Sequence, residues 1–233
     1  MLGIKWYNMQ LEQNIKGLCS KFGIDFQDFL SDLDVEDVHE LTVFDLEAVC
    51  EEYEIDLLSL LFKPLFKEGQ WKKKAKTIKL LVVDVDGVLT DGGMYFTENG
   101  DQIKKYNTKD GMGIMRLQEK GIQVAFLSSG FTDVMVQKRA EMLGITLCYV
   151  GQDKKIDVLS KWCSELSIEW NQVAYLGDDI NDLECIRKVG FSACPVNAVN
   201  TVKTEVDVIL SNKGGDGCVR NFIDNYLLDS PIS

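Results

Sequence analysis

The chain has few of the residues on which many catalytic and metal sites depend. Its 233 residues contain a single histidine. The histidine, His39, lies far in sequence from the carboxylate-rich motifs, which argues against a Ser-His-Asp triad and favours a place on a surface helix. Seven cysteines occur without any Cys-x-x-Cys pair. This scattered set argues against a zinc site or disulfide framework and indicates reduced thiols in the cytoplasm.

Long apolar runs and an overall basic charge are also missing. No apolar run approaches the ~18 residues of a membrane span, and the first residues, MLGIKWYNMQLEQ, lack the regions of a signal peptide. The net charge is −12. Because nucleic acids select basic surfaces, we expect neither nucleic acid nor a membrane as a partner.

The charge changes sign twice along the chain and divides it into three parts. Residues 1–62 carry 3 basic and 14 acidic side chains, whereas residues 63–79 carry 7 lysines and 1 glutamate. We therefore predict an acidic module over residues 1–64, a basic linker over 65–78 and a main domain over 79–233. The lysines of the linker can attract phosphate, but a solvated connector is the preferred interpretation.

The acidic module is predicted to be all-α. Apolar residues at helical spacing predict a helix over 11–22, and Gly23 suits its end. Further helices are expected over 25–33, from the N-cap Thr42 onward, and over 57–62. The stretch LTVFDLEAVCEEYEIDLLSLLF, residues 41–62, resembles the closing helices of lambda-repressor-like helix-turn-helix domains. Its acidity argues against reading DNA, so the module is interpreted as a packing or association unit.

From residue 79 the pattern alternates between strand and helix. This alternation predicts an α/β fold, with a Rossmann-like parallel sheet and helices on both faces. Functional sites in such sheets lie at the carboxyl ends of the strands. Strands are expected at 80–85, 122–127, 146–149, 173–176, 191–194 and 206–210, and helices at 111–120, 133–143, 154–166, 180–188 and 216–228.

One segment, residues 94–107, interrupts this alternation. Two short strand-like runs flank Asn99-Gly100, and Asn-Gly is a strong hairpin signal. The segment is predicted to form a β-hairpin flap above the site. Its apolar side chains need burial that a lone hairpin cannot supply, so we expect packing against other subunits. These side chains are Met94, Phe96, Ile103 and Tyr106.

The most informative motif is VVDVDGVLTD at residues 82–91. An apolar strand ends in Asp84 and Asp86, which an extended chain places on one side. Two buried carboxylates so close together are costly unless a cation or a shared proton relieves them. The pattern predicts a metal-assisted site in which one aspartate is the nucleophile and the other the acid/base. The alternative is a strand end whose aspartates cap a turn.

Three further strand ends carry polar residues. Ser128-Ser129-Gly130 follows one strand and offers a hydroxyl and backbone N–H groups to an anion. The sequence GQDKK, residues 151–155, follows the next strand with lysines that can neutralise a phosphoryl group. The last, GDDIND, carries Asp178, Asp179 and Asp182, and such a cluster suits Mg²⁺. Taken singly, each has an ordinary alternative as loop, surface lysine or helix cap.

In order and context these motifs resemble the haloacid dehalogenase superfamily over residues 79–228. The closer resemblance is to its capless subgroup of 3-deoxy-D-manno-octulosonate 8-phosphate (KDO 8-phosphate) phosphatases. Phosphatases of KDN or sialic acid 9-phosphates are similar relatives through residues 90–94 and 107–110. The segments that carry the closer resemblance are DVDGVLTDGGMYF (84–96), KKYNTKDGMGI (104–114), RAEMLGI (139–145), GQDKK (151–155) and GGDGCVRNF (214–222).

The resemblance implies a role for each motif. Asp84 attacks phosphorus, Asp86 moves the protons, and Ser128 and Lys155 hold the phosphoryl oxygens. Lys155 is preferred to Lys154 because it falls on the family position. Mg²⁺ is held by the Asp84 and Asp178 carboxylates and the Asp86 backbone carbonyl, with Asp179 and Asp182 orienting its waters.

Substrate contacts and assembly are also implied by the resemblance. The matching substrate-binding positions are Asn107, Lys109, Asp110, Gly111, Ser129 and Arg139. A homotetramer joined through the hairpin of residues 94–106 is expected. KDO 8-phosphate is the preferred substrate and the 9-phosphate of KDN or N-acylneuraminate the alternative, because Ser129-Gly130-Phe131 has neither the arginine nor the glutamate of these relatives.

A hypothesis from a different class is a regulatory or scaffold protein. Its working part would be the helical module, and its phosphatase domain would be vestigial. The intact set of Asp84, Asp86, Lys155 and Asp178 argues against this hypothesis.

Overall fold

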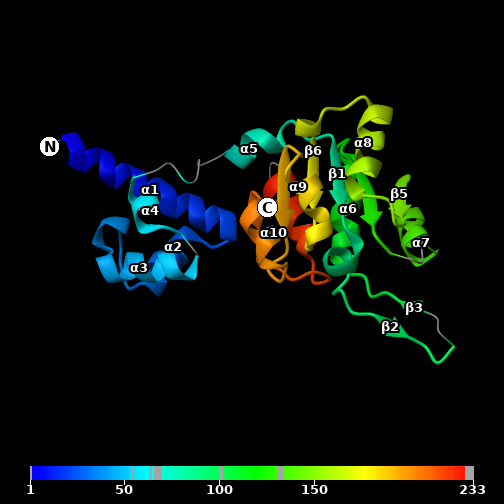
Figure 1. Ribbon diagram of the computed structural model, residues 1–233, viewed down its shortest axis with the longest axis horizontal. Coiled ribbons are helices and arrows are strands. Elements are labelled where there is room, and N and C mark those ends of the chain that lie inside the picture. Colours follow the sequence, from blue (N-terminus) through cyan, green and yellow to red (C-terminus); the bar gives the residue numbers. More distant parts are fainter. Residues whose placement is uncertain are drawn as a thin grey trace. The chain divides into compact units, whose positions relative to one another are not determined.

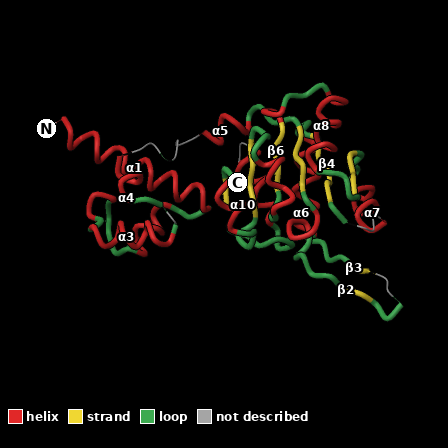
Figure 2. The backbone as a smooth tube through the Cα atoms, viewed as in Figure 1, coloured by secondary structure: helices red, strands yellow, loops and turns green. Residues whose placement is uncertain are grey.

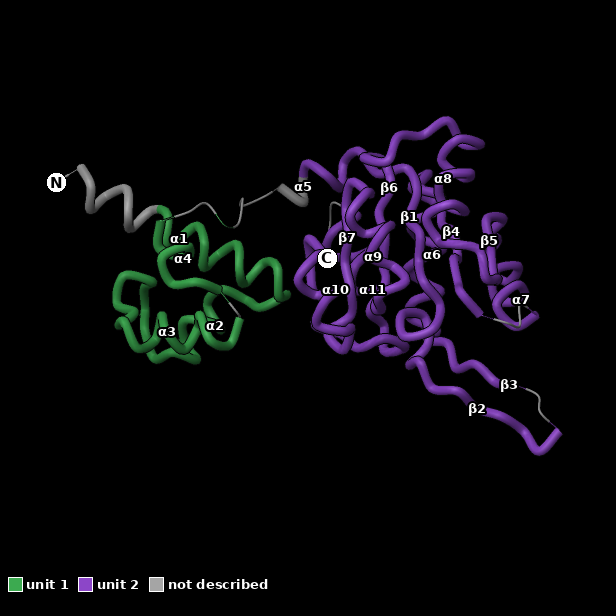
Figure 3. The backbone as a smooth tube through the Cα atoms, in the orientation of Figure 1, with its two compact units in different colours: residues 1–70 green, residues 71–233 purple. Residues whose placement is uncertain are grey.

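The computed structural model describes residues 2–53, 55–62, 65, 70–99, 102–130 and 134–228. Its chain forms two compact units, residues 1–70 and 71–233, which Figure 3 shows in different colours. We call them unit 1 and unit 2 and describe each by itself.

Unit 1 is built from helices, as the sequence predicts. It contains α1 (Leu2–Phe22), α2 (Phe26–Asp32), the short 3-10 helix η1 (Val38–Glu40), α3 (Val43–Glu52) and α4 (Leu57–Phe62). The apolar stripe of α1 forms the centre of its core, where Ile15 and Leu18 are fully buried. His39 is exposed on η1.

The helix ends in unit 1 lie where local side chains cap them. Gly23 adopts φ +66° after α1, a left-handed conformation that glycine takes at little cost. The Thr42 hydroxyl accepts from the Asp45 backbone N–H, and the Asp45 carboxylate accepts from that of Thr42. This capping box confirms the predicted start of α3.

The stretch predicted as a linker contains regular structure. Residues Gln70–Ala75 form helix α5. Ile78 is 5% exposed and belongs to the core of unit 2, against which Ala75 also packs. These two apolar residues, three positions apart, attach the segment to unit 2. The composition of the segment did not indicate this attachment, because lysines surround the two apolar residues.

The sheet of unit 2 has six parallel strands in the order β5-β4-β1-β6-β7-β8 (Figures 1 and 2). The chain first adds strands on one side of β1 and then on the other. The crevice where the order reverses is the usual ligand site of such sheets. The strands are β1 (Leu80–Val83), β4 (Gln123–Ser128), β5 (Leu147–Val150), β6 (Val173–Leu176), β7 (Phe191–Cys194) and β8 (Val208–Ile209).

Helices cover both faces of this sheet. Leu81 and Val83 of β1 join a core cluster that includes residues of α6 (Thr108–Glu119) and α11 (Cys218–Phe222). The alternate residues, Leu80 and Val82, point the other way and are equally buried. Helix α9 (Leu183–Ile186) contacts β6, β7 and α8 (Lys155–Leu166). The predicted Rossmann-like architecture is therefore confirmed.

The remaining elements of unit 2 are short. They are the π-helical turn η2 (Val85–Leu89), α7 (Val134–Met142), η3 (Trp170–Gln172), η4 (Ile180–Asp182), α10 (Asn200–Glu205) and η5 (Ile223–Leu227). Helix α10 was not predicted, because its six residues carry too few apolar positions to show a helical period.

The predicted hairpin forms and extends away from the sheet (Figure 1). Strands β2 (Tyr95–Phe96) and β3 (Gln102–Ile103) pair antiparallel. Gly100 and Asp101 of the expected turn lie outside the described residues. Met94, Phe96 and Ile103 are exposed by 69%, 61% and 54%. Tyr106 needs no second subunit for its burial, because it already packs against the core of unit 2.

Two predicted absences concern membranes and disulfides. Within the described residues, none of the helices combines the length and the apolar character needed to cross a membrane. All seven cysteines lie in the described part of the chain, and none is in a disulfide.

Candidate active site

The two motif aspartates follow β1 but lie in different environments. The strand ends at Val83, and Asp84 remains extended at φ −67° and ψ 159°. The chain then turns sharply, with Gly87 at φ +91°. Two-residue alternation therefore stops at Asp84. As a result, Asp84 is buried, with 5% of its surface exposed, whereas 43% of the Asp86 side chain is exposed.

Lys155 joins the first aspartate to the third carboxylate motif. It begins α8, and its ammonium group donates to Asp84 Oδ1 and to Asp182 Oδ1, both at 2.7 Å. The Lys155 side chain is only 2% exposed. Lys154 is exposed at the N-cap of the same helix. The structure thus directs Lys155, rather than Lys154, toward Asp84.

Asp182 connects Lys155 to strand β6 and to the turn that follows this strand. Its Oδ1 also accepts from the Tyr175 hydroxyl at 2.6 Å. Its Oδ2 accepts from the backbone N–H groups of Asp178 and Asp179, at 3.0 and 3.2 Å. Since both oxygens are engaged by the protein, Asp182 ties Lys155 to the turn after β6. Asp179 is exposed and caps that turn at Ile180.

Asp178 completes a site with the chemistry of a divalent cation. One oxygen each of Asp84, Asp178 and Asp182 lies within 4.8 Å of the others. Three carboxylates around one lysine leave two uncompensated negative charges. Among the described residues, Asp178 Oδ1 is buried and has no hydrogen-bond partner. An orphaned, buried carboxylate oxygen in an anionic cluster fits a hard cation such as Mg²⁺.

The backbone leaves room for Asp178. A Cβ atom on Gly87 would come within 2.0 Å of Asp178 Oδ2. The glycine of Asp-x-Asp-Gly is therefore required both by its positive φ and by the approach of the opposite carboxylate.

The electrostatics of the cluster reflect its excess negative charge. Burial, reinforced by the Asp182 carboxylate, raises the pKa of Asp178 to about 6. Burial, again with Asp182, raises the pKa of Asp84 above its ordinary value. Burial alone lowers the pKa of Lys155, but Asp84 and Asp182 more than offset this, so its pKa is raised and it remains protonated. A bound divalent cation would relieve both carboxylates.

Asp86 is bound from the hairpin side. Its Oδ1 accepts from the Lys104 ammonium group, and the Thr90 hydroxyl lies 3.5 Å from the same oxygen. Lys104 directly follows β3. The two motif aspartates are therefore held by different lysines, Lys155 for Asp84 and Lys104 for Asp86.

The motif at the end of β4 occupies the predicted strand end. Ser128 is its last residue and is 2% exposed, and its Oγ accepts from the Gly130 N–H at 3.2 Å. The sequence interpretation assumed that the backbone N–H groups at this strand end are free to bind an anion. In the structure, the Gly130 N–H is instead engaged by the Ser128 hydroxyl. Ser129 is exposed and accepts from Asn181 Nδ2 at 3.2 Å. Phe131, on which the substrate comparison partly depends, lies outside the described residues.

The substrate-binding positions implied by resemblance form a group around α6. Asn107 caps this helix through the Lys109 N–H, and Lys109 is exposed. Asp110 is 1% exposed and accepts from the Arg220 N–H at 2.8 Å, which fixes the start of α11. The guanidinium carbon of Arg139 lies 5.6 Å from the centre of the Tyr106 ring. A Cβ atom on Gly111 would lie 2.5 Å from Nη2 of Arg139, so only glycine leaves room for this side chain.

Asp110 has a second feature that structure alone reveals. Burial raises its pKa to about 6, although backbone N–H groups of α11 oppose this. In the described structure its Oδ2 is buried without a hydrogen-bond partner. Its contacts identify a buried carboxylate that supports α11, which the resemblance did not indicate.

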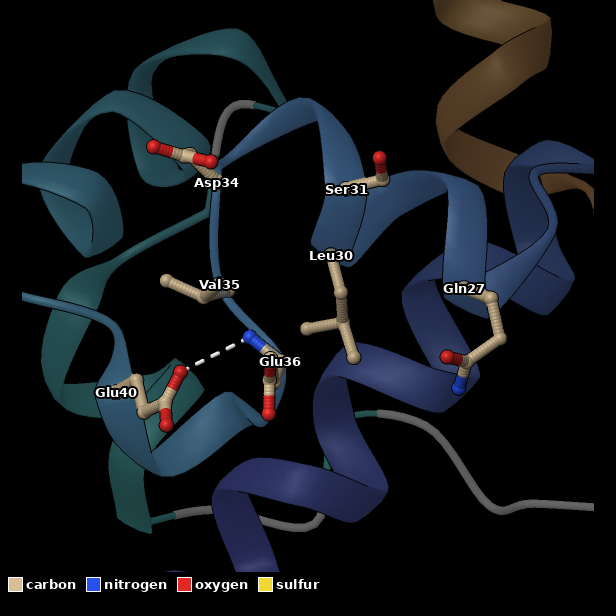
Figure 4. Close-up of a pocket in the computed structure, with 7 residues that line it drawn as sticks. All are labelled: Gln27, Leu30, Ser31, Asp34, Val35, Glu36 and Glu40. Carbon is tan, nitrogen blue, oxygen red and sulfur yellow. Dashed lines mark hydrogen bonds between the residues drawn. The ribbon is translucent and has the colours of Figure 1, made fainter.

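A hollow of about 690 Å³ occurs elsewhere, in unit 1 (Figure 4). Glu40 accepts there from the Glu36 N–H at 2.9 Å. The lining is acidic and contains none of the motif residues, so it is unsuited to a phosphate ester. The lining residues are Gln27, Leu30, Ser31, Asp34, Val35, Glu36 and Glu40.

Sequence reasoning missed two partners of the site. Lys104 belongs to the run KKYNTKDGMGI, but nothing in its sequence position marks it as a partner of Asp86. Tyr175 looks like an ordinary strand residue, although its hydroxyl is buried against Asp182. A polar tip in an otherwise apolar strand, VAYL, was the available signal for the second.

Comparison with known proteins gives consistent matches. Residues 151–223 match the haloacid dehalogenase-like hydrolase family. The 3-deoxy-D-manno-octulosonate 8-phosphate phosphatase KdsC of Escherichia coli K12 is 39% identical over 155 residues, covering 66% of this chain and 82% of that protein. The KdsC of Haemophilus influenzae is 37% identical over 156 residues, covering 67% and 86%.

Solved structures agree with these sequence matches. The 3-deoxy-D-manno-octulosonate 8-phosphate phosphatase of Moraxella catarrhalis, solved with magnesium, phosphate and KDO, gives a TM-score of 0.67 at 35% identity, covering 69% of this chain and 92% of that one. A probable YrbI-family phosphatase of Pseudomonas syringae gives 0.65 at 43% identity, covering 67% and 88%.

Proposed function

Since the chain belongs to the family of haloacid dehalogenase-like hydrolases that includes the KDO 8-phosphate phosphatases, we propose that it is a Mg²⁺-dependent phosphatase of KDO 8-phosphate. The observation that carries the proposal is the buried contact of Lys155 with Asp84 and Asp182 beside the orphaned Asp178 oxygen. This cluster combines a carboxylate nucleophile, a fixed cation and a place for a metal ion.

In the proposed reaction, Asp84 is the nucleophile. One of its carboxylate oxygens bonds to phosphorus while the bond from phosphorus to the sugar oxygen breaks. Asp86 gives its proton to that leaving oxygen and then takes a proton from the water that hydrolyses the aspartyl phosphate. Lys155 and Ser128 offer positive charge and a hydroxyl to the phosphoryl oxygens, whose charge must be stabilised in the transition state.

The metal has a defined set of candidate ligands. The Asp84 and Asp178 carboxylates and the Asp86 backbone carbonyl would hold Mg²⁺, with Asp179 and Asp182 supporting it from the adjacent turn. When bound, the ion supplies charge neutralisation between the nucleophile and the phosphate. Its charge matches the two negative charges that Lys155 leaves uncompensated.

The sugar-acid part of the substrate is assigned to the group around α6. Asn107, Lys109, Asp110, Gly111, Ser129 and Arg139 are the proposed binding positions. Of these, Arg139 is the cation best suited to a carboxylate, because it lies half-buried beside an aromatic ring. Gly111 supports this assignment by leaving space for its guanidinium group.

The assembly and the role of unit 1 belong to the same proposal. Exposed Met94, Phe96 and Ile103 on the hairpin support a homotetramer joined through residues 94–106. Residues 1–64 would form an association module, joined by 65–78 to a phosphatase domain over 79–233, with Ala75 and Ile78 of the joining segment packed against the core of that domain. Seven cysteines without a disulfide support a cytoplasmic location.

Phosphate release from two substrates tests the proposal. KDO 8-phosphate and N-acylneuraminate 9-phosphate should be compared with Mg²⁺ present and after its removal by EDTA. We expect a higher kcat/KM for KDO 8-phosphate and loss of turnover without the metal. A higher kcat/KM for the 9-phosphate would transfer the assignment to that substrate.

No release from either substrate by the folded protein would contradict the proposal. The scaffold hypothesis then becomes testable with Asp84→Asn, because a role that depends on the helical module alone would survive this substitution.

A further inference from the structure

Lys104 is a buried cation whose described ion pair is with Asp86. Only 7% of its side chain is exposed, against 43% for that of Asp86. An ammonium group loses hydration when it is buried and needs a partner to compensate. The neighbouring Lys105 differs, since 72% of its side chain is exposed and its ammonium lies 3.9 Å from Asp91.

The contact leaves the two oxygens of Asp86 in different states. Oδ1 accepts from Lys104 and lies 3.5 Å from the Thr90 hydroxyl. Thr90 is itself 1% exposed, so it forms a fixed support. Over the described residues, no hydrogen bond engages Oδ2 of Asp86. One oxygen is therefore anchored and the other remains available.

We propose that Lys104 is a positioning residue for the acid/base Asp86. By holding Oδ1, it aims Oδ2 at the place where a leaving oxygen, and later a water, exchanges a proton. This inference rests on the proposed function, in which Asp86 moves those protons. Lys104 acts through Asp86 and does not touch the reacting atoms.

The position of Lys104 gives the hairpin a part in this reaction. It follows Ile103, the last residue of β3, without an intervening loop. The orientation of Asp86 thus depends on the position of the residues that follow β3 at the base of the hairpin. The competing interpretation is that Lys104 leaves Asp86 and binds the substrate directly.

Kinetics of three single variants test the proposal. Lys104→Met should lower kcat about 10- to 100-fold with KM changed by less than about threefold, because acid–base catalysis contributes 10²- to 10⁴-fold and is lost in part. Lys105→Met, the matched control, should behave as the original chain. A main effect on KM would overturn the proposal in favour of direct substrate binding.

A double-mutant cycle sharpens the test. In the Asp86→Asn background, Lys104→Met should cause no further loss, because the group that it positions is already gone. A multiplicative loss in the double variant would overturn the proposal. The cycle should be run on KDO 8-phosphate and on 4-nitrophenyl phosphate.

The second ester separates this inference from the proposed function. Hydrolysis of 4-nitrophenyl phosphate but not of KDO 8-phosphate would remove the KDO 8-phosphate assignment, while the cycle on 4-nitrophenyl phosphate still decides the role of Lys104. If neither ester is hydrolysed, both the proposed function and this role are overturned.

Discussion

The two units place their charge differently. Unit 1 contains most of the acidic excess of the chain. Among its described residues, however, the buried polar side chain is that of Asn14, which is neutral. Its amide donates to the Leu60 carbonyl and accepts from the Leu65 N–H. Unit 2 buries Asp84, Asp110, Lys155 and Asp182.

This difference shows which charges indicate function. Charges on a surface cost little and serve solubility and association. Charges in a core are costly and persist where partners or a ligand compensate them. The strong acidity of unit 1 therefore carries less functional information than the few buried carboxylates of unit 2.

The largest expected effect is that of Asp84→Asn on activity. Removing the nucleophile should lower kcat at least about 10⁴-fold, measured as phosphate release under saturating Mg²⁺. The same substitution at an exposed acid of unit 1, Asp28→Asn, should leave kcat unchanged. Comparable activity in the two variants would contradict the contrast between the units.

The next effect concerns Asp182, which is 0% exposed. Asp182→Leu removes a partner of Lys155 and Tyr175 and of two backbone N–H groups. The free energy of unfolding, measured in urea, should fall by about 3 to 5 kcal/mol. Asp179→Asn in the same turn is the control and should change the free energy of unfolding little, because asparagine caps a helix about as well as aspartate does.

A buried charge introduced into unit 1 gives the reverse test. Asn14→Asp would place a carboxylate against the Leu60 carbonyl, where the amide now donates. We expect unit 1 to lose about 3 kcal/mol of stability, followed by circular dichroism, with phosphatase activity unchanged. The exposed Asn200→Asp serves as control. A stable Asn14→Asp variant would show that unit 1 tolerates core charge after all.

The smallest effect is a dependence of stability on pH. Because burial raises the pKa of Asp110 to about 6, the folded state holds its proton to higher pH than the unfolded state does. Stability should therefore decrease as pH rises from about 4 to about 6, by no more than about 1.4 kcal/mol per pH unit for Asp110, and then level off. Asp178 adds to the same trend in the metal-free protein.

Asp110→Asn should reduce this slope, since the titrating group is removed. The measurement is urea unfolding at several pH values without Mg²⁺, with Asp28→Asn as control. An unchanged slope in Asp110→Asn would rule out this carboxylate as a source of the effect.

Much of the architecture was predictable because it follows from local patterns. Apolar periodicity indicates the six strands and most helices, and the capping residues Thr42 and Asp45 mark a helix start. The attachment of residues 70–78 to unit 2 was not predictable, since it depends on contacts of Ala75 and Ile78 with distant residues.

The site was predictable in part for the same reason. Asp84, Ser128, Lys155 and Asp178 stand at or just after strand ends, and parallel strands bring such positions to one edge. In the structure Asp84, Lys155 and the Asp178–Asp182 turn lie together at that edge. The role of Lys104 was not predictable, because its contact with Asp86 spans eighteen residues and depends on the hairpin.

By itself, the sequence determined the composition of the two units, the α/β order of elements and the residues available for phosphoryl chemistry. These depend on side-chain type and spacing. Only the tertiary structure decided which groups are partners: Lys155 with Asp84 and Asp182, and Lys104 with Asp86. Partnership depends on burial and on distances between remote segments, and these arise only when the sheet and the hairpin are assembled.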